Sequence, residues 1–138
     1  MSANPDPSEL TDSLVQTSFT VIALLSQVAA AHDLSLTQLR VLAILRDHQP
    51  KMAELAAHLG LDRSSVSGLI DRAAKRGLVQ RETSADDGRA VHVTFTPAGR
   101  RLTRQLTKEI GDLLAPMTQN LNPTDQKRLS TLLPKLLE

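Results

Sequence analysis

The stretch GLDRSSVSGLIDRAAKRGLV, residues 60–79, decides the fold of this chain. Gly60 can adopt the left-handed conformation that ends a short helix, and Asp62 can cap the helix that follows. The apolar positions of this second helix recur at helical spacing and predict its buried side: Val66, Leu69, Ile70 and Ala73. Gly77 then ends the helix. Two helices joined by a tight glycine turn predict a helix-turn-helix motif.

The opposite side of the second helix is polar and largely basic, and presents Arg63, Ser64, Ser67, Gly68, Asp71, Arg72 and Lys75. Short hydroxyl side chains let a helix approach a DNA groove closely, and Arg63 is long enough to reach a guanine edge. Arg72, Lys75 and Arg76 lie further along, where they suit phosphate contacts, and the helix N-terminus also favours phosphate. A solvated basic face with ordinary capping serines explains this helix alone equally well.

The residues that follow change their period from helical to alternating. Polar and apolar residues alternate over 91–95, which predicts a half-buried strand, and residues 78–83 can form its partner. The loop between them, SADDGRA, has the Asp-Gly chemistry of a hairpin turn. A hairpin directly after a helix-turn-helix is a wing, and its presence favours DNA binding over a solvated surface.

Apolar periodicity predicts helices in the rest of the chain. They cover roughly residues 8–31, a segment from Ser35 or Thr37 to about His48, residues 51–59, and two C-terminal helices opened by Thr96-Pro97 and Asn122-Pro123. Pro116 and Pro134 interrupt the last two, and we expect a kink near each because proline removes an amide donor. The predicted fold is therefore mainly α with a small β-hairpin wing.

Composition narrows the class of protein further. A chain of 138 residues with 41% apolar residues suits one globular domain, and the absence of cysteine excludes disulfides and thiolate chemistry within it. The polar, acidic N-terminus MSANPDPSELTDS is unlike a signal peptide. No run of apolar residues approaches the ~18 of a membrane span. We expect a cytoplasmic protein with no membrane partner.

The net charge of +1 is distributed unevenly along the chain. Residues 1–50 carry a net charge of −3, residues 51–104 carry +4, and residues 105–138 are balanced. The positive charge coincides with the predicted helix-turn-helix and wing, which indicates a localised face for a polyanion.

Three quoted segments carry a family resemblance: LTQLRVLAIL (36–45), AELAAHLGLDRSSVSGLIDRAAKRGLVQRE (53–82) and DDGRAVHVTFTPAGRRL (86–102). Over them the chain resembles the MarR family of bacterial transcriptional regulators. The resemblance implies a single MarR-like domain over 1–138, with a winged helix-turn-helix over 36–104 and dimerisation helices over 8–31 and 105–138. It also implies a homodimer that binds a pseudo-palindromic operator, usually as a repressor, and that small anionic or phenolic ligands release.

The resemblance carries over to named positions of the predicted DNA site. It places Arg89 at the wing tip in the minor groove, with Asp87 holding that loop in shape, and it places the serines of the helix in the major groove. Gly68 and Gly88 depart from the family pattern, because many members carry larger polar or basic residues there. The complete predicted DNA-binding set is Arg63, Ser64, Ser65, Ser67, Gly68, Arg72, Lys75, Arg76, Asp87 and Arg89.

The resemblance, together with basic residues in an otherwise acidic N-terminal region, predicts a pocket for a small aromatic or anionic effector between the first two helices and the long helix. The expected lining combines apolar side chains with two possible counter-charges, namely Val21, Leu25, Leu42 and Leu106 with Arg40 and Arg46.

Other functions find less support in the sequence. The four histidines lack metal-ligand spacing, no phosphate-binding, zinc-protease or nucleophile-elbow motif is present, and the serines of SSVSG have no recognisable base. We therefore expect no catalytic residues, metal or cofactor. The remaining alternative is a winged-helix module that binds protein without regulated DNA binding. The combination of Arg89 at the wing with a helix of hydroxyls and cations favours DNA binding over protein binding.

Overall fold

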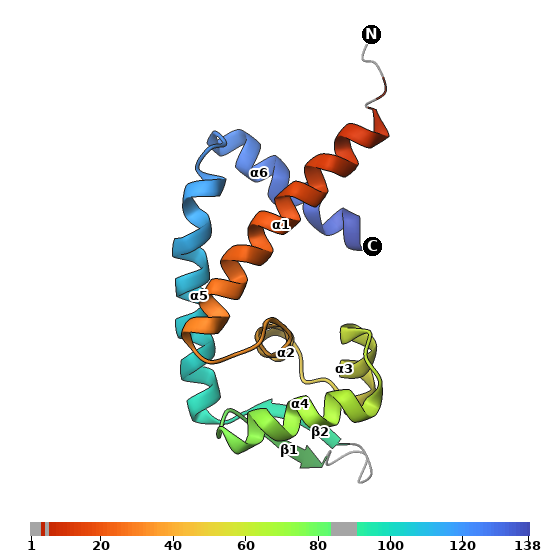
Figure 1. The fold of residues 1–138 in the computed structure, drawn as a ribbon, viewed down its shortest axis with the longest axis vertical. Helices are drawn as coiled ribbons and strands as arrows, with labels where there is room; N and C mark the ends of the chain where they lie inside the picture. Colours follow the sequence, from red (N-terminus) through yellow and green to blue (C-terminus); the bar gives the residue numbers. More distant parts are fainter. Residues whose placement is uncertain (1–3, 5, 84–90) are drawn as a thin grey trace. The chain divides into compact units, whose positions relative to one another are not determined.

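The computed structural model describes residues 4, 6–83 and 91–138 and is mostly helical (Figure 1). Its elements follow in the order α1 (Pro7–Ala31), α2 (Leu36–Asp47), α3 (Met52–Leu59), α4 (Arg63–Lys75), β1 (Val79–Thr83), β2 (Val91–Phe95), α5 (Pro97–Thr118), α6 (Pro123–Leu132) and a short 3-10 helix, η1 (Leu133–Leu137). The predicted fold class, mainly α with one antiparallel hairpin, is confirmed.

Contacts divide the chain into two compact units. Residues 25–107 form one, here called the winged unit, and residues 1–24 with 108–138 form the other, here called the terminal unit. The division falls near the predicted border between DNA-binding and dimerisation regions, although it passes inside α1 and α5. That residues 1–138 act as one domain stays a prediction.

Local capping fixes the helices of the winged unit. Ser35, and not Thr37, caps α2: its hydroxyl accepts from the Gln38 amide at 3.0 Å, while the Gln38 side chain accepts from the Ser35 amide at 2.9 Å. Gly60 ends α3 with a φ of 66°, in the left-handed region that glycine adopts without strain. The predicted helix-turn-helix is therefore confirmed, with α3 and α4 as its two helices.

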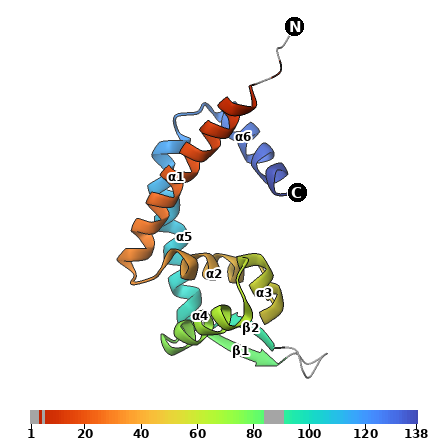
Figure 2. The same cartoon turned by 45° about the vertical axis from the view of Figure 1, so that its right-hand side comes forward.

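The hairpin packs against these helices within the winged unit (Figure 2). Its strands pair antiparallel in the register Val79↔Phe95 to Thr83↔Val91. The Val93 amide donates to the Pro50 carbonyl at 3.2 Å, so β2 is also held by the segment between α2 and α3. The centre of the core is formed by side chains from three elements that solvent does not reach, namely Leu55, Val66, Ile70 and Val93.

The junction between β2 and α5 is closely packed. Thr96 caps α5 as predicted, because its hydroxyl accepts from the Gly99 amide at 3.0 Å. Gly99 is buried, and a Cβ at this position would lie 1.9 Å from the Leu78 carbonyl oxygen. Only glycine fits here, which fixes the angle at which α5 leaves the sheet.

In the terminal unit, the two prolines have different outcomes. Pro116 lies inside α5, which continues to Thr118, whereas at Pro134 the α-helix has given way to the 3-10 helix η1. The predicted interruption at Pro134 therefore takes the form of a change in helix type. A kink at Pro116 stays a prediction.

Large apolar side chains of the terminal unit are exposed to solvent. They belong to α1, α6 and η1, and include Leu10, Leu14, Val15, Phe19, Ile22, Leu129, Leu132, Leu133, Leu136 and Leu137. The exposed fraction of Phe19 is 68% and that of Leu137 is 91%. These faces are uncovered within one copy of the chain.

One expectation from the sequence needs correction. By length and composition alone, α1 could cross a membrane, since an 18-residue window reaches a mean hydropathy of 1.6 and is only 11% buried. Its apolar residues are not consecutive, because serines, threonines and glutamines are scattered through an uncharged run over 14–31. Helices of soluble proteins can pass the same test of length and composition. The test therefore does not show that α1 lies in a membrane.

Candidate nucleic-acid interface

The start of α4 is built around Asp62. Its carboxylate accepts from the Ser65 amide and from the Ser64 hydroxyl, both at 2.8 Å. These hydrogen bonds, the Ser65 amide first, lower the pKa of Asp62, so the cap is ionised at neutral pH. The cap already occupies one of the amides that the sequence assigned to phosphate, which leaves the outward side chains as the stronger candidates for a DNA contact.

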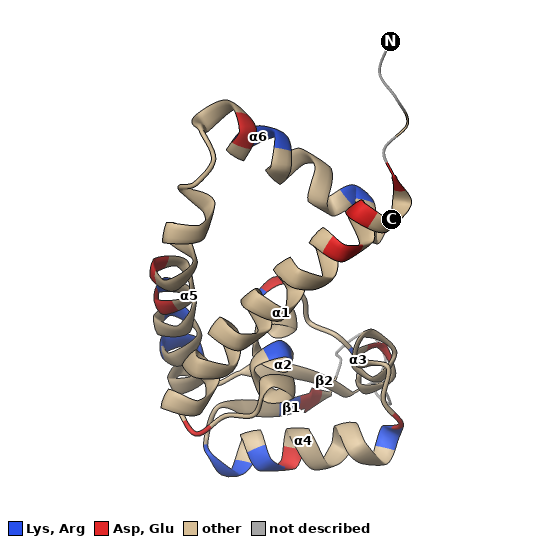
Figure 3. Cartoon of the chain, turned by 45° about the horizontal axis from the view of Figure 1, so that its top comes forward, with Lys and Arg blue, Asp and Glu red and all other residues tan. Residues whose placement is uncertain are grey.

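The two sides of α4 differ as predicted. Val66, Leu69, Ile70 and Ala73 are buried in the core of the winged unit. The other side, here called the outer face of α4, carries the exposed Arg63, Ser64, Ser65, Asp71, Arg72 and Lys75, with Ser67 and Gly68 half-buried. Figure 3 shows basic positions at both ends of this helix. The core thus holds the apolar side of α4, and most of its hydroxyls and cations lie exposed to solvent.

Gly68 allows a neighbouring side chain to lie close to the helix. A Cβ at position 68 would lie 3.4 Å from Nη1 of Arg72, so the Arg72 guanidinium extends back along the outer face toward the helix start. The departure from the family pattern at Gly68 therefore coincides with a basic group placed over it.

Arg81 joins the hairpin to α4, a role that the sequence analysis missed. From β1 its guanidinium forms an ion pair with Asp71 at 2.8 Å and donates to the Ser67 carbonyl at 3.4 Å. Asp71, the acidic residue of the outer face, is thereby neutralised, and the stem of the wing is fastened to the helix. No spacing rule could have paired residues ten positions apart on different elements.

Arg76 has partners that its predicted role did not include. Its guanidinium donates to the His32 carbonyl at 2.9 Å and to the Asp33 carbonyl at 3.0 Å, in the turn after α1. Arg76 therefore braces the end of α4 against the α1–α2 connection. Its predicted phosphate contact stays a prediction. Arg72 and Lys75 are also exposed, and they lie on the outer face.

The wing tip lies outside the described residues. Asp87, Gly88 and Arg89 fall within 84–90, and the described part of the hairpin ends at the pair Thr83↔Val91. Their roles stay predictions.

The six residues predicted to line an effector pocket have different surroundings. Leu42 lines a small cavity of about 10 Å³, and Arg46 lines a separate pocket of about 560 Å³. Arg40 lines neither, and donates to the His58 carbonyl at 2.9 Å. Leu106 is buried, Leu25 is half-buried, and Val21 belongs to the terminal unit. One shared pocket stays a prediction.

Two histidines far apart in the sequence meet in the winged unit. The rings of His48 and His58 stack with their centroids 6.1 Å apart. Among the residues that the structure describes, no group of three or more histidines, cysteines or acidic residues could hold a metal ion.

A helix-turn-helix followed by a two-stranded hairpin defines a winged helix-turn-helix protein. A protein-family model described as MarR family matches residues 32–90. The multiple antibiotic resistance protein MarR of Salmonella typhimurium is 30% identical over 116 residues, which are 83% of this chain and 81% of that protein. The chain belongs to the MarR family.

A second relative and two solved structures agree with this assignment. An uncharacterized HTH-type transcriptional regulator of Bacillus subtilis, YfiV, is 31% identical over 96 residues, which are 69% of this chain but only 60% of YfiV. A MarR variant from E. coli complexed with operator DNA has a TM-score of 0.73 at 26% identity, with 94% of each chain covered. BpsR of Bordetella bronchiseptica, whose DNA binding is regulated by 6-hydroxynicotinic acid, has a TM-score of 0.73 at 25% identity, with 99% of each chain covered.

Proposed function

We propose that this protein is a transcriptional regulator that binds double-stranded DNA in a sequence-specific manner. The observation that carries the proposal is the outer face of α4, where hydroxyls and cations project from a helix that the core holds rigidly. A helix of this kind fits the major groove, where each base pair presents a distinct pattern of donors and acceptors. The match to a MarR variant in complex with operator DNA supports the same conclusion.

Different residues perform different parts of this binding. Arg63 and Ser67 meet base edges and specify the sequence, while Arg72 and Lys75 meet phosphates and supply affinity that depends on salt. Arg89 enters the adjacent minor groove from the wing, where groove width and the A·T content are read. Arg81 and Asp71 hold the stem of the wing against α4, so both elements reach the duplex together.

The working form is a homodimer in the cytoplasm. The exposed apolar faces of α1, α6 and η1 form a surface that a monomer leaves in contact with water, and such surfaces mark interfaces. A second copy of the chain covers them across a two-fold axis and doubles the DNA-binding helices, which matches a pseudo-palindromic operator. We assign the apolar face of α1 to this partner and not to lipid.

Regulation follows from the same arrangement. A dimer bound over an operator blocks transcription, which makes the protein a repressor, and a small anionic or aromatic effector releases it. The regulation of BpsR by 6-hydroxynicotinic acid supports an effector of this size and charge.

Binding-site selection from random duplexes, followed by affinity measurements at several salt concentrations, tests the proposal. We expect an enriched sequence with two-fold symmetry and an affinity that falls steeply with salt, since several phosphate contacts release counterions. Enrichment of no sequence, with no salt-dependent binding to duplex DNA, would leave the protein-binding winged module as the better account.

A further inference from the structure

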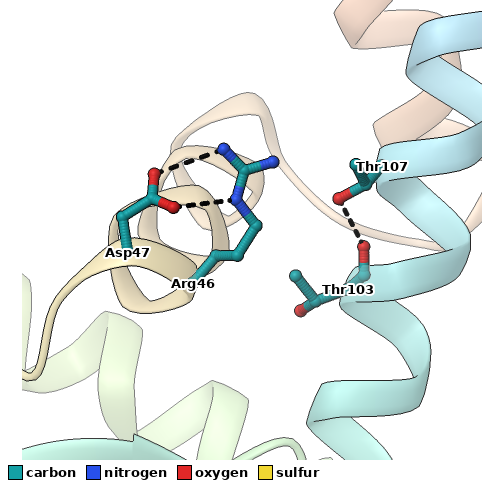
Figure 4. Close-up of polar contacts among 4 residues, drawn as sticks. All are labelled: Arg46, Asp47, Thr103 and Thr107. Carbon is teal, nitrogen blue, oxygen red and sulfur yellow. Dashed lines mark hydrogen bonds and ion pairs between the residues drawn. The ribbon is translucent and has the colours of Figure 1, made fainter.

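A pocket of the winged unit is lined by no described residue of α4. It has a volume of about 560 Å³ and is formed by the end of α2, by β2 and by the first half of α5. Figure 4 shows four residues of its wall: Arg46 and Asp47, paired with each other at the end of α2, and Thr103 and Thr107 on α5. None of the predicted DNA-binding residues that the structure describes lines it.

The charges around this pocket are unbalanced. Arg46, Arg100 and Arg104 line it, and Asp47 is the acidic residue among the lining groups. Asp47 accepts from Arg46 at 3.1 and 3.2 Å, so that pair is mutually neutralised. Among the described residues, the side chains of Arg100 and Arg104 have neither an ion pair nor a hydrogen bond. Like charges one helical turn apart repel each other, and a bound anion removes that cost.

Two hydroxyl groups of the pocket lack partners. Thr103 is 6% exposed, and neither its Oγ1 nor that of Thr94 has a hydrogen-bond partner in the described structure. Thr107 does not satisfy them, because its hydroxyl donates to the Thr103 carbonyl at 2.8 Å. Buried polar groups are normally paired, so these two oxygens are unsatisfied. Each exposes less than 1 Å² to solvent, so a ligand group can pair with them only after the threonine side chain turns toward the pocket. The site therefore offers cations at its surface, with unsatisfied oxygens behind them.

We propose that this pocket binds a small dianion that also carries hydroxyl or carbonyl oxygens, in the class of phosphate monoesters and hydroxylated dicarboxylates. Three arginines against one aspartate leave a net charge of +2 to be matched. Guanidinium groups bind phosphate and carboxylate through paired N–H donors, which suits Arg100 and Arg104 one turn apart. The C-terminal end of α2 carries partial negative charge, which opposes an anion, and the two arginines of α5 offset it.

The pocket includes residues of the hairpin, so a bound ligand would contact the strand that leads to the wing. Thr94 and Phe95 belong to β2, and they pair with Gln80 and Val79 of β1. β1 in turn is fastened to α4 through Arg81. A ligand held between α2, α5 and β2 therefore contacts the strand that leads to the wing. That this contact changes operator affinity rests on the proposed function, whereas binding itself does not.

The binding test uses the full-length protein, at constant ionic strength, with glycerol 3-phosphate and malate as probes. Glycerol and lactate serve as the neutral and the non-aromatic monoanionic controls. Calorimetry and thermal shift should detect either dianion at up to about 10 mM, because a ligand that binds the folded state raises its stability. Binding of glycerol 3-phosphate alone identifies a phosphate site, and binding of malate alone identifies a dicarboxylate site. Binding of neither dianion, or equal responses to dianions and controls, overturns the proposal.

Substitution of one arginine that lines the pocket and of a nearby one that does not distinguishes specific dianion binding from non-specific attraction by surface charge. Arg101 is exposed on α5 beside Arg100 but does not line the pocket, so Arg101→Gln is the matched control for Arg104→Gln. We expect Arg104→Gln to weaken dianion binding about tenfold or more, the equivalent of about 1.4 kcal/mol, and Arg101→Gln to leave it unchanged. Equal losses in the two variants overturn the proposal.

Thr103→Val keeps the branched shape and removes the hydroxyl. The free variant should melt at the same temperature as the wild type or higher, because an unpaired buried hydroxyl is gone, while dianion affinity falls several-fold. A variant that melts lower and binds equally well would assign the hydroxyl a structural role and overturn its part in the site. Dianion binding without any change in operator affinity would retain the site and disconnect it from regulation.

Discussion

The winged unit and the terminal unit use apolar residues in opposite ways. In the winged unit the stripes of α3, α4 and β2 close on one another, and solvent reaches none of Leu55, Ile70 or Val93. In the terminal unit, α1, α6 and η1 leave Leu10, Phe19 and their neighbours exposed. Similar helical periodicity therefore specifies an internal core in one unit and an external surface in the other. The winged unit buries its own apolar faces, whereas the terminal unit leaves apolar faces exposed, which we assign to a second copy of the chain.

The largest expected effect concerns that partner. Leu132→Asp places a carboxylate on the exposed apolar face of α6, where dimer formation would have to strip it of water. Leu36→Asp is the matched control, since Leu36 is 38% exposed but belongs to the winged unit. Sedimentation should give about twice 15.0 kDa for the wild type and for Leu36→Asp, and 15.0 kDa for Leu132→Asp. Deletion of residues 122–138 should likewise abolish the dimer and operator binding.

A monomeric wild type at micromolar concentration would contradict the assignment of these faces to a second copy. If that monomer also bound to lipid vesicles through α1, the apolar run over 14–31 would belong to a membrane and not to an interface.

The helix α5 has one glycine in each unit, so the effect of adding a side chain can be compared between the two units. Gly99 lies in the winged unit, where a Cβ would meet the Leu78 carbonyl oxygen, while Gly111 lies in the terminal unit with nothing within 4 Å of such an atom. Gly99→Ala should destabilise the protein by about 3 kcal/mol or more, since backbone must move. Gly111→Ala should stabilise it by about 0.5–1 kcal/mol through helix propensity. Urea unfolding measures both, and changes of the same sign would remove the distinction between the two positions.

Variants of Arg63 and Arg89 are expected to affect different properties of DNA binding: Arg63 the specificity for sequence, and Arg89 the affinity. Arg63→Ala should narrow the gap between the operator and a half-site mutant by about 1–3 kcal/mol, because a bidentate base contact is lost. Arg89→Ala should weaken binding and flatten the salt dependence by up to about one unit, with preference at the half-site centre retained. Binding-site selection with both variants decides. If Arg63→Ala weakens binding to all sequences equally, and Arg89→Ala changes the base preference at the half-site centre, the two roles are reversed.

The winged unit could be predicted well from the sequence because its signals are local. Gly60, Asp62 and Gly77 each act within one turn of the backbone, and the alternation over 91–95 needs only a neighbouring strand. The terminal unit lacks signals of this kind. Periodicity showed that its helices have apolar faces, but it could not show what covers them, and counting consecutive apolar residues missed the uncharged run of α1.

The candidate site was predictable in its residue types and less so in its contacts. Which side of α4 faces outward follows from periodicity, and the structure agrees. The partners of Arg81 and Arg76 depend on where a strand and a distant turn come to lie, and this information is tertiary. The pocket with Thr103 is invisible in the sequence for the same reason, since its wall comes from three elements.

The smallest expected effect distinguishes Lys75 from Arg76, adjacent cations at the end of α4. Arg76 donates to two carbonyls after α1, while Lys75 is exposed on the outer face. Arg76→Gln should lower the free energy of unfolding by up to about 1 kcal/mol, because these exposed hydrogen bonds are partly replaced by water, and leave the salt slope unchanged. Lys75→Gln should do the reverse, with stability unchanged and the salt slope of DNA binding smaller by about one unit. Urea unfolding and binding at several salt concentrations measure the two effects. A smaller salt slope for Arg76→Gln at unchanged stability would show that the guanidinium leaves the carbonyls to meet phosphate, as the sequence alone suggested.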